Sequence, residues 1–192
     1  MADTQQVDAL YDAAQKSYLE GDFQAALRDW QAALALAPGD FEIQKKLVQA
    51  HFALGDHEGG EAALSALREA WRTSADPAVQ GTDEVVIDQL RVDGLRVYAY
   101  ETLRPRSPEL HYALTWRVFD AEGRVMMTAQ LESSAYGREV GVPFVFGVNT
   151  PRGHATTGPS FSARPPYLAV REIAVQQIQK GLATQGQGAS SR

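Results

Sequence analysis

Residues 21–38 read GDFQAALRDWQAALALAP, and this stretch decides the fold of the N-terminal half of the chain. Its apolar side chains recur every three or four residues, at Phe23, Ala26, Leu27, Trp30 and Leu34. This spacing places them along one face of an α-helix. Asp22 is a suitable N-cap for that helix, and Pro38 ends it because proline lacks a backbone N–H. The stretch therefore predicts one amphipathic helix between a glycine turn and a proline turn.

A second helix precedes this one, and the pair is repeated along the chain. The same spacing occurs before Gly21, at Leu10, Ala13, Ala14 and Ser17. The triplet Gly21-Asp22-Phe23 returns as Gly55-Asp56-His57, 34 residues later. A fixed period of this length indicates stacked helical hairpins, each of which covers the next. Because Gly59-Gly60 is a poor helix interior, we expect the last helix to start near Gly60 or Glu61 and to end near Arg72.

The first hairpin resembles the tetratricopeptide repeat family, and the resemblance extends over about residues 7–74. That family places small residues where paired helices cross, and Ala14, Ala26 and Ala33 stand at these positions. It also places a proline after the second helix, where this chain has Pro38. The resemblance implies antiparallel helix pairs that bind another protein or a peptide.

Carried over by position, the resemblance implies a partner-binding groove along the first helix of each hairpin. The groove residues that it implies are Tyr11, Gln15, Tyr18, Lys45, Lys46, Gln49 and Phe52. Some relatives clamp the terminal carboxylate of a peptide with lysine, asparagine and arginine at such positions. Lys45 and Gln49 match that clamp only in part, because glutamine replaces asparagine and the third repeat is missing. Lysines on the solvated side of a helix are the favoured interpretation.

The second half of the chain has the pattern of β-strands, with apolar and polar residues in alternation. We expect strands over residues 84–92, 95–103, 110–119 and 124–134, with one or two short strands at 144–148 and 154–161. Asp93-Gly94 predicts a two-residue hairpin turn, and residues 120–123 predict a four-residue loop. Because short connections join antiparallel neighbours, the strands should form an antiparallel meander.

Helical periodicity returns after Pro165-Pro166. One face of this segment carries Tyr167, Val170, Ile173, Ala174, Ile178 and Leu182, so a C-terminal helix should lie across the apolar face of the sheet. The predicted fold class is α+β, with helical hairpins followed by the antiparallel sheet and its helix. The predicted organisation is a helical domain (1–76), a linker (77–83), a sheet domain (84–183) and a disordered tail (184–192).

A second candidate site lies on the sheet. Tyr98 and Tyr100 point away from the neighbouring apolar positions of their strand, and His154 lies in a glycine- and threonine-rich stretch. The tyrosines fit three roles: a joint between the two halves, a partner site, or a small-molecule pocket. For His154, a polar site and an exposed turn are the alternatives.

Charge is distributed unevenly along the chain. The net charge is −6, of which residues 1–80 carry −7 (13 acidic and 6 basic residues) and residues 81–192 carry +1 (11 acidic and 12 basic). An acidic half argues against nucleic acid as a ligand, since phosphates would be repelled. It suits a partner with a basic face, although a solvated acidic surface explains the same excess.

The sequence carries no recognisable catalytic motif. Phosphate-binding and dinucleotide-binding glycine motifs and the Gly-x-Ser-x-Gly turn are absent, there is no cysteine, and the four histidines lack zinc-ligand spacing. We therefore expect no enzyme activity, no metal and no cofactor. The polar N-terminus and the lack of a long apolar run favour a cytoplasmic protein without membrane insertion. The preference for arginine over lysine is typical of bacterial coding sequences.

Together these patterns favour an interaction protein: an adaptor or assembly subunit that binds a partner through the groove or through a cleft between the halves. The alternative is a module that holds a small apolar molecule within the sheet and its helix.

Overall fold

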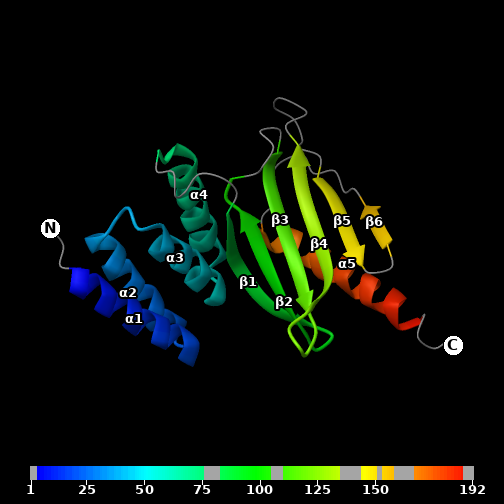
Figure 1. The fold of residues 1–192 in the computed structure, drawn as a ribbon, viewed down its shortest axis with the longest axis horizontal. Coiled ribbons are helices and arrows are strands. Elements are labelled where there is room, and N and C mark those ends of the chain that lie inside the picture. Colours follow the sequence, from blue (N-terminus) through cyan, green and yellow to red (C-terminus); the bar gives the residue numbers. More distant parts are fainter. Residues whose placement is uncertain are drawn as a thin grey trace. The chain divides into compact units, whose positions relative to one another are not determined.

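The computed structural model describes residues 4–75, 83–104, 110–134, 144–150, 153–157 and 167–187. The chain divides into two compact units, Met1–Gln80 and Gly81–Arg192, referred to as unit 1 and unit 2. Four helices make up unit 1, and an antiparallel sheet followed by one helix makes up unit 2 (Figure 1). The α+β prediction is therefore confirmed. The predicted linker lies, except for Asp83, outside the described residues.

The helices of unit 1 are α1 (Thr4–Glu20), α2 (Phe23–Leu36), α3 (Phe41–Ala53) and α4 (His57–Thr73). Each packs against the next along the chain, so the unit is two consecutive helical hairpins. An aspartate caps each of the last three helices, because its side chain accepts a hydrogen bond from a backbone N–H of the first turn. These bonds run from Ala25 to Asp22, from Glu42 and Ile43 to Asp40, and from Gly59 to Asp56.

The start of α4 differs from the prediction. The helix begins at His57, before Gly60, because the Asp56 carboxylate accepts the Gly59 N–H at 3.0 Å and fixes the first turn. Gly60 itself is buried, and a Cβ built there would lie 2.9 Å from the ring of Phe52. The two glycines are thus not a break in the helix, and Gly60 gives the Phe52 ring room against α4.

The core of unit 1 is built around Trp30, whose side chain is wholly buried. Three alanines with no exposed surface, Ala14, Ala26 and Ala33, belong to the same cluster. Their short side chains allow the helices to approach, and the indole fills the remaining space. The rings of Tyr11 and Tyr18 border it, with centroids 6.4 and 5.5 Å from that of Trp30.

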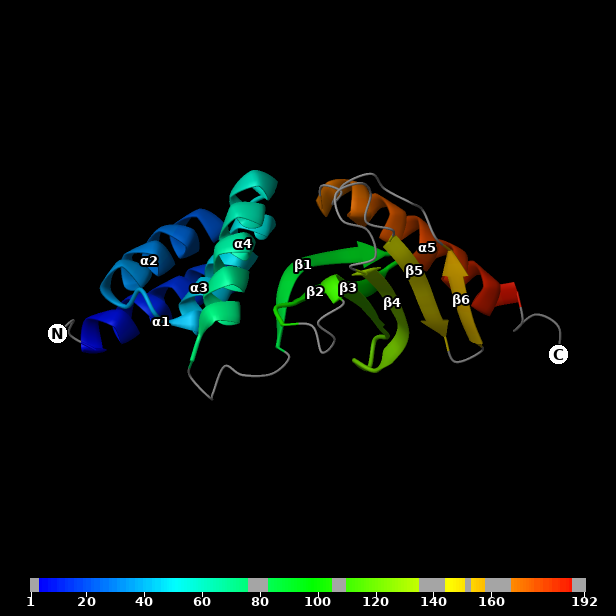
Figure 2. The ribbon, with the colours of Figure 1, turned by 90° about the horizontal axis from the view of Figure 1, so that it is seen from above.

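Unit 2 is a six-stranded antiparallel meander in which the order in the sheet follows the order in the chain. Its strands are β1 (Glu84–Val92), β2 (Leu95–Thr102), β3 (Leu110–Phe119), β4 (Val125–Ser134), β5 (Phe144–Thr150) and β6 (Gly153–Thr157). Asp93 and Gly94 have φ angles of 50° and 81°, as a two-residue hairpin turn requires. Helix α5 (Tyr167–Gln187) lies along one face of the sheet (Figure 2).

The register divides the sheet into two faces. The helix-side face carries buried residues in matched rows: Val97, Ala99 and Glu101 of β2, Leu114, Trp116 and Val118 of β3, and Met127, Ala129 and Leu131 of β4. The outer face carries the alternate residues: Arg96, Tyr98 and Tyr100 of β2, and Thr115, Arg117 and Phe119 of β3. Such alternation is what the period of two in the sequence predicts.

A bulge in β1 positions the anchor of α5. The register shifts between Val86 and Asp88, which brings Asp88 opposite Ala99 and hence onto the helix-side face. There its carboxylate accepts hydrogen bonds from the Tyr167 hydroxyl at 3.1 Å and from Nε of Arg171 at 2.5 Å. The helix continues to Gln187, so residues 184–187 are helical, in contrast to the predicted tail; residues 188–192 lie outside the described part.

A first prediction concerns Gly60. Alanine is the better helix former by about 1 kcal/mol, but its methyl group would press on the Phe52 ring. We expect Gly60→Ala to lower the free energy of unfolding by about 1–3 kcal/mol, as overpacking usually does. Urea unfolding followed by helical circular dichroism measures this. Gly39→Ala is the matched control, because a Cβ there meets nothing within 4 Å.

A double variant at Phe52 and Gly60 tests the contact between these two residues more strictly. The double variant Phe52→Leu/Gly60→Ala lacks the aromatic ring that the new methyl group would press on. Its loss in unfolding free energy should therefore be smaller than the sum of the losses in Phe52→Leu and in Gly60→Ala. A Gly60→Ala protein that is as stable as Gly39→Ala would contradict the close contact between α3 and α4.

A second prediction concerns Asp88. Asp88→Asn keeps the shape of the side chain but removes the charge that holds Tyr167 and Arg171, and we expect a loss of about 1–3 kcal/mol in unfolding free energy. Asp93→Asn is the control, because asparagine suits the left-handed turn position equally well. Equal stability of the two variants would show that Asp88 does not anchor α5.

Candidate functional site

The implied groove residues lie on α1 and α3, the first helix of each hairpin, but several of them serve the packing of unit 1. Tyr11 and Tyr18 are half-buried beside Trp30. Phe52 is 5% exposed and packs next to Gly60 and the ring of His57, with ring centroids 5.9 Å apart. The structure therefore places Phe52 between α3 and α4 rather than on an open surface.

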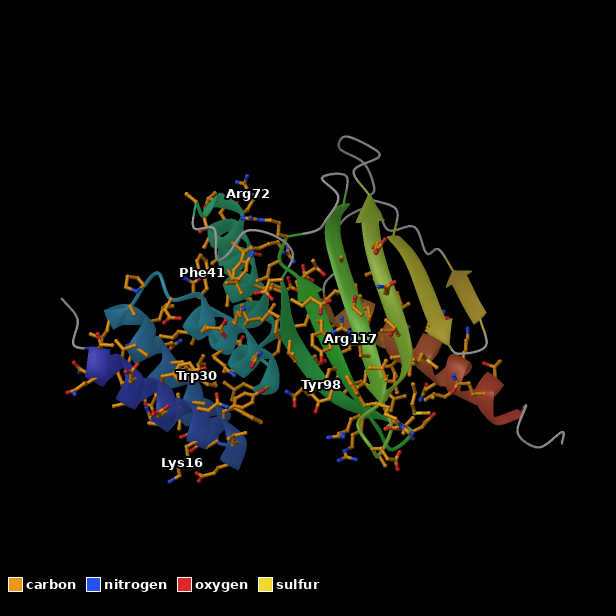
Figure 3. All side chains as sticks on the ribbon, viewed as in Figure 1. Lys16, Trp30, Phe41, Arg72, Tyr98 and Arg117 are labelled. Carbon is orange, nitrogen blue, oxygen red and sulfur yellow. The ribbon has the colours of Figure 1, made fainter. Side chains whose placement is uncertain are left out.

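Lys45 is held by residues of its own unit. Its ammonium group donates to the Glu42 carboxylate at 3.0 Å and lies 4.9 Å from the centre of the Trp71 ring. Phe41 meets that ring edge-on, at 5.0 Å between centroids (Figure 3). With 14% of its side chain exposed, Lys45 is engaged by an acid and an aromatic ring. A carboxylate from a partner would have to compete with Glu42, so a carboxylate clamp is not favoured here.

Gln15, Lys46 and Gln49 are half-buried. The amide oxygen of Gln15 is buried and accepts no hydrogen bond from the residues that the structure describes. The indole N–H of Trp30 is also buried and likewise finds no acceptor within the described ranges. A buried polar group without a hydrogen bond costs about 1–3 kcal/mol.

Negative charge gathers around Tyr11. Burial raises the pKa of the Tyr11 hydroxyl, and the carboxylates of Glu42, Asp40 and Asp12 raise it further, because each disfavours a second negative charge. These three acids come from α3, from its N-cap and from α1. We call them the acidic patch. Among the described residues, only Glu42 of the three pairs with a lysine, Lys45, and the patch therefore keeps a net negative charge.

The acidic patch was not among the residues predicted for the groove. Asp40 follows Pro38-Gly39 and is a candidate N-cap from the sequence, whereas no sequence pattern singled out Asp12 or Glu42. The available signal was the excess of acids in residues 1–80, which gives a sign but no location. Their convergence on Tyr11 depends on how α1 packs beside α3, which helical periodicity alone does not specify.

The predicted sheet site separates into parts. Tyr98 meets Phe119 edge-on at 5.4 Å, whereas Tyr100 lies beneath the Arg117 guanidinium at 4.4 Å. Arg117 also donates two hydrogen bonds, at 2.8 and 3.0 Å, to the Glu84 carboxylate (Figure 3). His154 lies on β6 opposite Asn149, with three strands between β6 and β2, and its side chain is outside the described part. The structure brings the two tyrosines onto one face and leaves His154 apart.

The described ranges show neither a metal site nor a membrane-spanning helix. They contain no group of three or more acidic, histidine or cysteine side chains placed to hold a metal ion. None of the described helices combines the length and the apolar character needed to span a membrane.

Comparison with known proteins identifies the helical half. A family model described as tetratricopeptide repeat matches residues 17–81, from the last turn of α1 through α4, and so confirms the resemblance drawn from the sequence. No curated protein and no solved structure matches the chain. Tetratricopeptide repeats generally mediate interactions between proteins, and unit 1 has the helical hairpins of such an array.

A third prediction concerns the titration of Tyr11. The difference in phenolate absorbance between the wild type and Tyr11→Phe should show a pKa above the ordinary 10.0, and Glu42→Gln should bring it closer to that value. Because the folded pKa is raised, the associated stability is fully present below pH 10.0 and is lost as pH rises through the raised pKa. Glu20→Gln, at an exposed position of α1, should leave the titration unchanged. A normal pKa in the wild type would show that no acidic patch surrounds the hydroxyl.

Proposed function

We propose that this tetratricopeptide repeat segment binds a cationic segment of another protein along the face formed by α1 and α3, and that the chain acts as an adaptor or assembly subunit rather than as an enzyme. The observation that carries the proposal is the acidic patch around Tyr11, on the helices that line the groove in this family. Protein binding is the general role of the repeat, and the charge of the ligand is what this chain adds.

Acidic residues outnumber basic residues in unit 1, and this excess favours a cationic ligand. Unit 1 contains 13 acidic and 6 basic residues in positions 1–80, and Lys45, a base beside the patch, is neutralised by Glu42. A lysine or arginine of a partner would meet Asp12, which is exposed, and Asp40, which is half-buried and therefore less screened than a charge in open water. Such pairs steer association and exclude acidic competitors more than they add affinity.

The buried amide oxygen of Gln15 supports the same ligand chemistry. It lies on α1, one turn from Tyr11, and accepts no hydrogen bond among the described residues. Cationic side chains bring N–H donors, which an acceptor of this kind can use if the amide turns outward.

The alternative function, an apolar-ligand module in unit 2, is less well supported. The two hollows described on the sheet are lined in part by Arg91 and Arg96, which suit an anion better than an apolar molecule. Phe52 and Lys45, included in the groove from the sequence, serve as packing residues in this proposal.

A fourth prediction tests the charge of the ligand. Two labelled peptides with the same leucine spacing, one rich in lysine and one rich in glutamate, are titrated with the full chain by fluorescence anisotropy. We expect only the lysine peptide to bind, and its affinity to fall as salt is raised. Asp12→Asn/Glu42→Gln should weaken binding by roughly three- to tenfold, since exposed charge pairs each contribute about 0.2–1 kcal/mol.

The control for this experiment is Glu20→Gln, which removes one acid from α1 at an exposed position. It should weaken binding of the lysine peptide much less than does Asp12→Asn/Glu42→Gln, which we call the patch variant. Equal binding of the two peptides, or equal affinities of the patch variant and the control, would overturn the proposal. Affinity purification from the source cells with the wild type and the patch variant then asks which protein is lost when the patch is removed.

A further inference from the structure

Two arginines stand directly opposite each other next to the β1–β2 turn. The register pairs Arg91 of β1 with Arg96 of β2, and both side chains are exposed. Side chains in such a pair have Cβ atoms about 4.5–5.5 Å apart, and like charges in this arrangement destabilise a sheet. The pair therefore lowers the stability of the sheet unless something of opposite charge binds to it.

Four of the described acids of unit 2 are engaged with other arginines. Asp88 holds Arg171, Glu84 holds Arg117, and Asp120 with Glu122 holds Arg124, at distances of 2.5–3.1 Å. Arg91 makes one long hydrogen bond, 3.4 Å, to the carbonyl of Gly94. Arg96 makes no hydrogen bond or ion pair with any residue in the described part of the chain. Asp93 is the acid closest in sequence, and no bond between it and either arginine occurs in this part.

A hollow lies on each side of this pair. The first, about 300 Å³, is lined by Gln89, Leu90, Arg91, Arg96, Val97 and Tyr98. The register makes Gln89 opposite Tyr98 and Arg91 opposite Arg96, so their four side chains surround the backbone of the Leu90–Val97 pair on the outer face. The second hollow, about 360 Å³, extends from the same arginines to Phe119 and Asp120. Each hollow thus combines the two guanidinium groups with one aromatic ring.

We propose that the Arg91–Arg96 pair is a binding site for a phosphate monoester attached to a flat ring, such as an aryl phosphate or a nucleoside monophosphate. The phosphate lies between the two guanidinium groups, and the ring lies in a hollow against Tyr98 or Phe119. The site belongs to the outer face of unit 2 and does not depend on the function proposed for unit 1.

Charge and hydrogen-bond capacity favour phosphate over a carboxylate. Two arginines bring two positive charges and up to ten N–H donors. A phosphate monoester carries about −1.5 to −2 charge at pH 7 and three terminal oxygens, whereas a carboxylate has one charge and two oxygens. Arginine also matches phosphate geometry through paired N–H donors. An aromatic ring on the ligand adds stacking on the tyrosine or phenylalanine side chain.

The test uses phenyl phosphate and adenosine monophosphate as probes on the full chain, by calorimetry and by thermal unfolding. Inorganic phosphate, adenosine and benzoate separate the contributions of the phosphate, the ring and the carboxylate. We expect both phosphate esters to bind more tightly than any of these three and to raise the melting temperature of unit 2. Arg96→Gln and Arg91→Gln should each weaken binding roughly tenfold or more, as loss of a charge-assisted contact does.

Stability without ligand provides an independent readout. Because each substitution relieves a like-charge pair, Arg96→Gln should unfold at the same temperature as the wild type or higher, so its weaker binding cannot be attributed to misfolding. Lys180→Gln removes one exposed positive charge from α5 and should bind the probes as the wild type does.

Three results would overturn the proposal. The first is no binding of either ester at about 10 mM, where even a millimolar dissociation constant gives near saturation. The second is unchanged affinity in Arg96→Gln. The third is benzoate or adenosine binding as tightly as the phosphate esters.

Discussion

The packing of Trp30 against three alanines is the contact on which unit 1 depends. The indole is the largest wholly buried side chain of the unit, and Ala14, Ala26 and Ala33 leave no surface exposed beside it. A helical hairpin buries its apolar face only if a neighbour covers it, and short side chains at the crossings make that approach close enough. This cluster joins residues of α1, α2 and α3 in one core. Residues as unlike as Tyr11 and Glu42 come together for this reason.

Much of this architecture could be predicted from the sequence, because local patterns determine it. The caps at Asp22, Asp40 and Asp56, the Asp93-Gly94 turn and the alternation along β2 to β4 each depend on residues close together in the chain. The helical hairpins were predicted for a further reason: a 34-residue repeat allows one well-patterned copy to support a weaker one.

The errors in prediction arose where a residue's role depends on a distant neighbour. Gly60 reads as a helix breaker, yet it lies within α4 because the ring of Phe52 occupies the space of a side chain. Asp88 was assigned no role from the sequence, because only the bulge in β1 turns it toward Tyr167 and Arg171. Residues 184–187, predicted as part of a disordered tail, differ in kind: they continue α5, and the Thr184 hydroxyl donates to the carbonyls of Lys180 and Gly181 within the same helix. Propensity is a weak guide when tertiary contacts decide the outcome.

The two candidate sites are places where charged side chains lack an oppositely charged partner among the described residues. Other charged side chains have such partners or cap helices. Asp56 caps a helix and also binds His51 at 2.7 Å, and these two hydrogen bonds lower its pKa, so it needs no further partner. Arg117 and Arg124 have carboxylates of their own. By contrast, Asp12 has no basic partner among the described residues, while Asp40 caps α3 and Glu42 binds Lys45, and Arg91 lies directly opposite Arg96 across two strands. Stability alone would favour neutralising both, and substitutions that relieve such strain at a binding site usually cost function. Charges that the fold does not use are therefore where we propose ligands of the opposite sign, a cationic segment on unit 1 and a phosphate ester on unit 2.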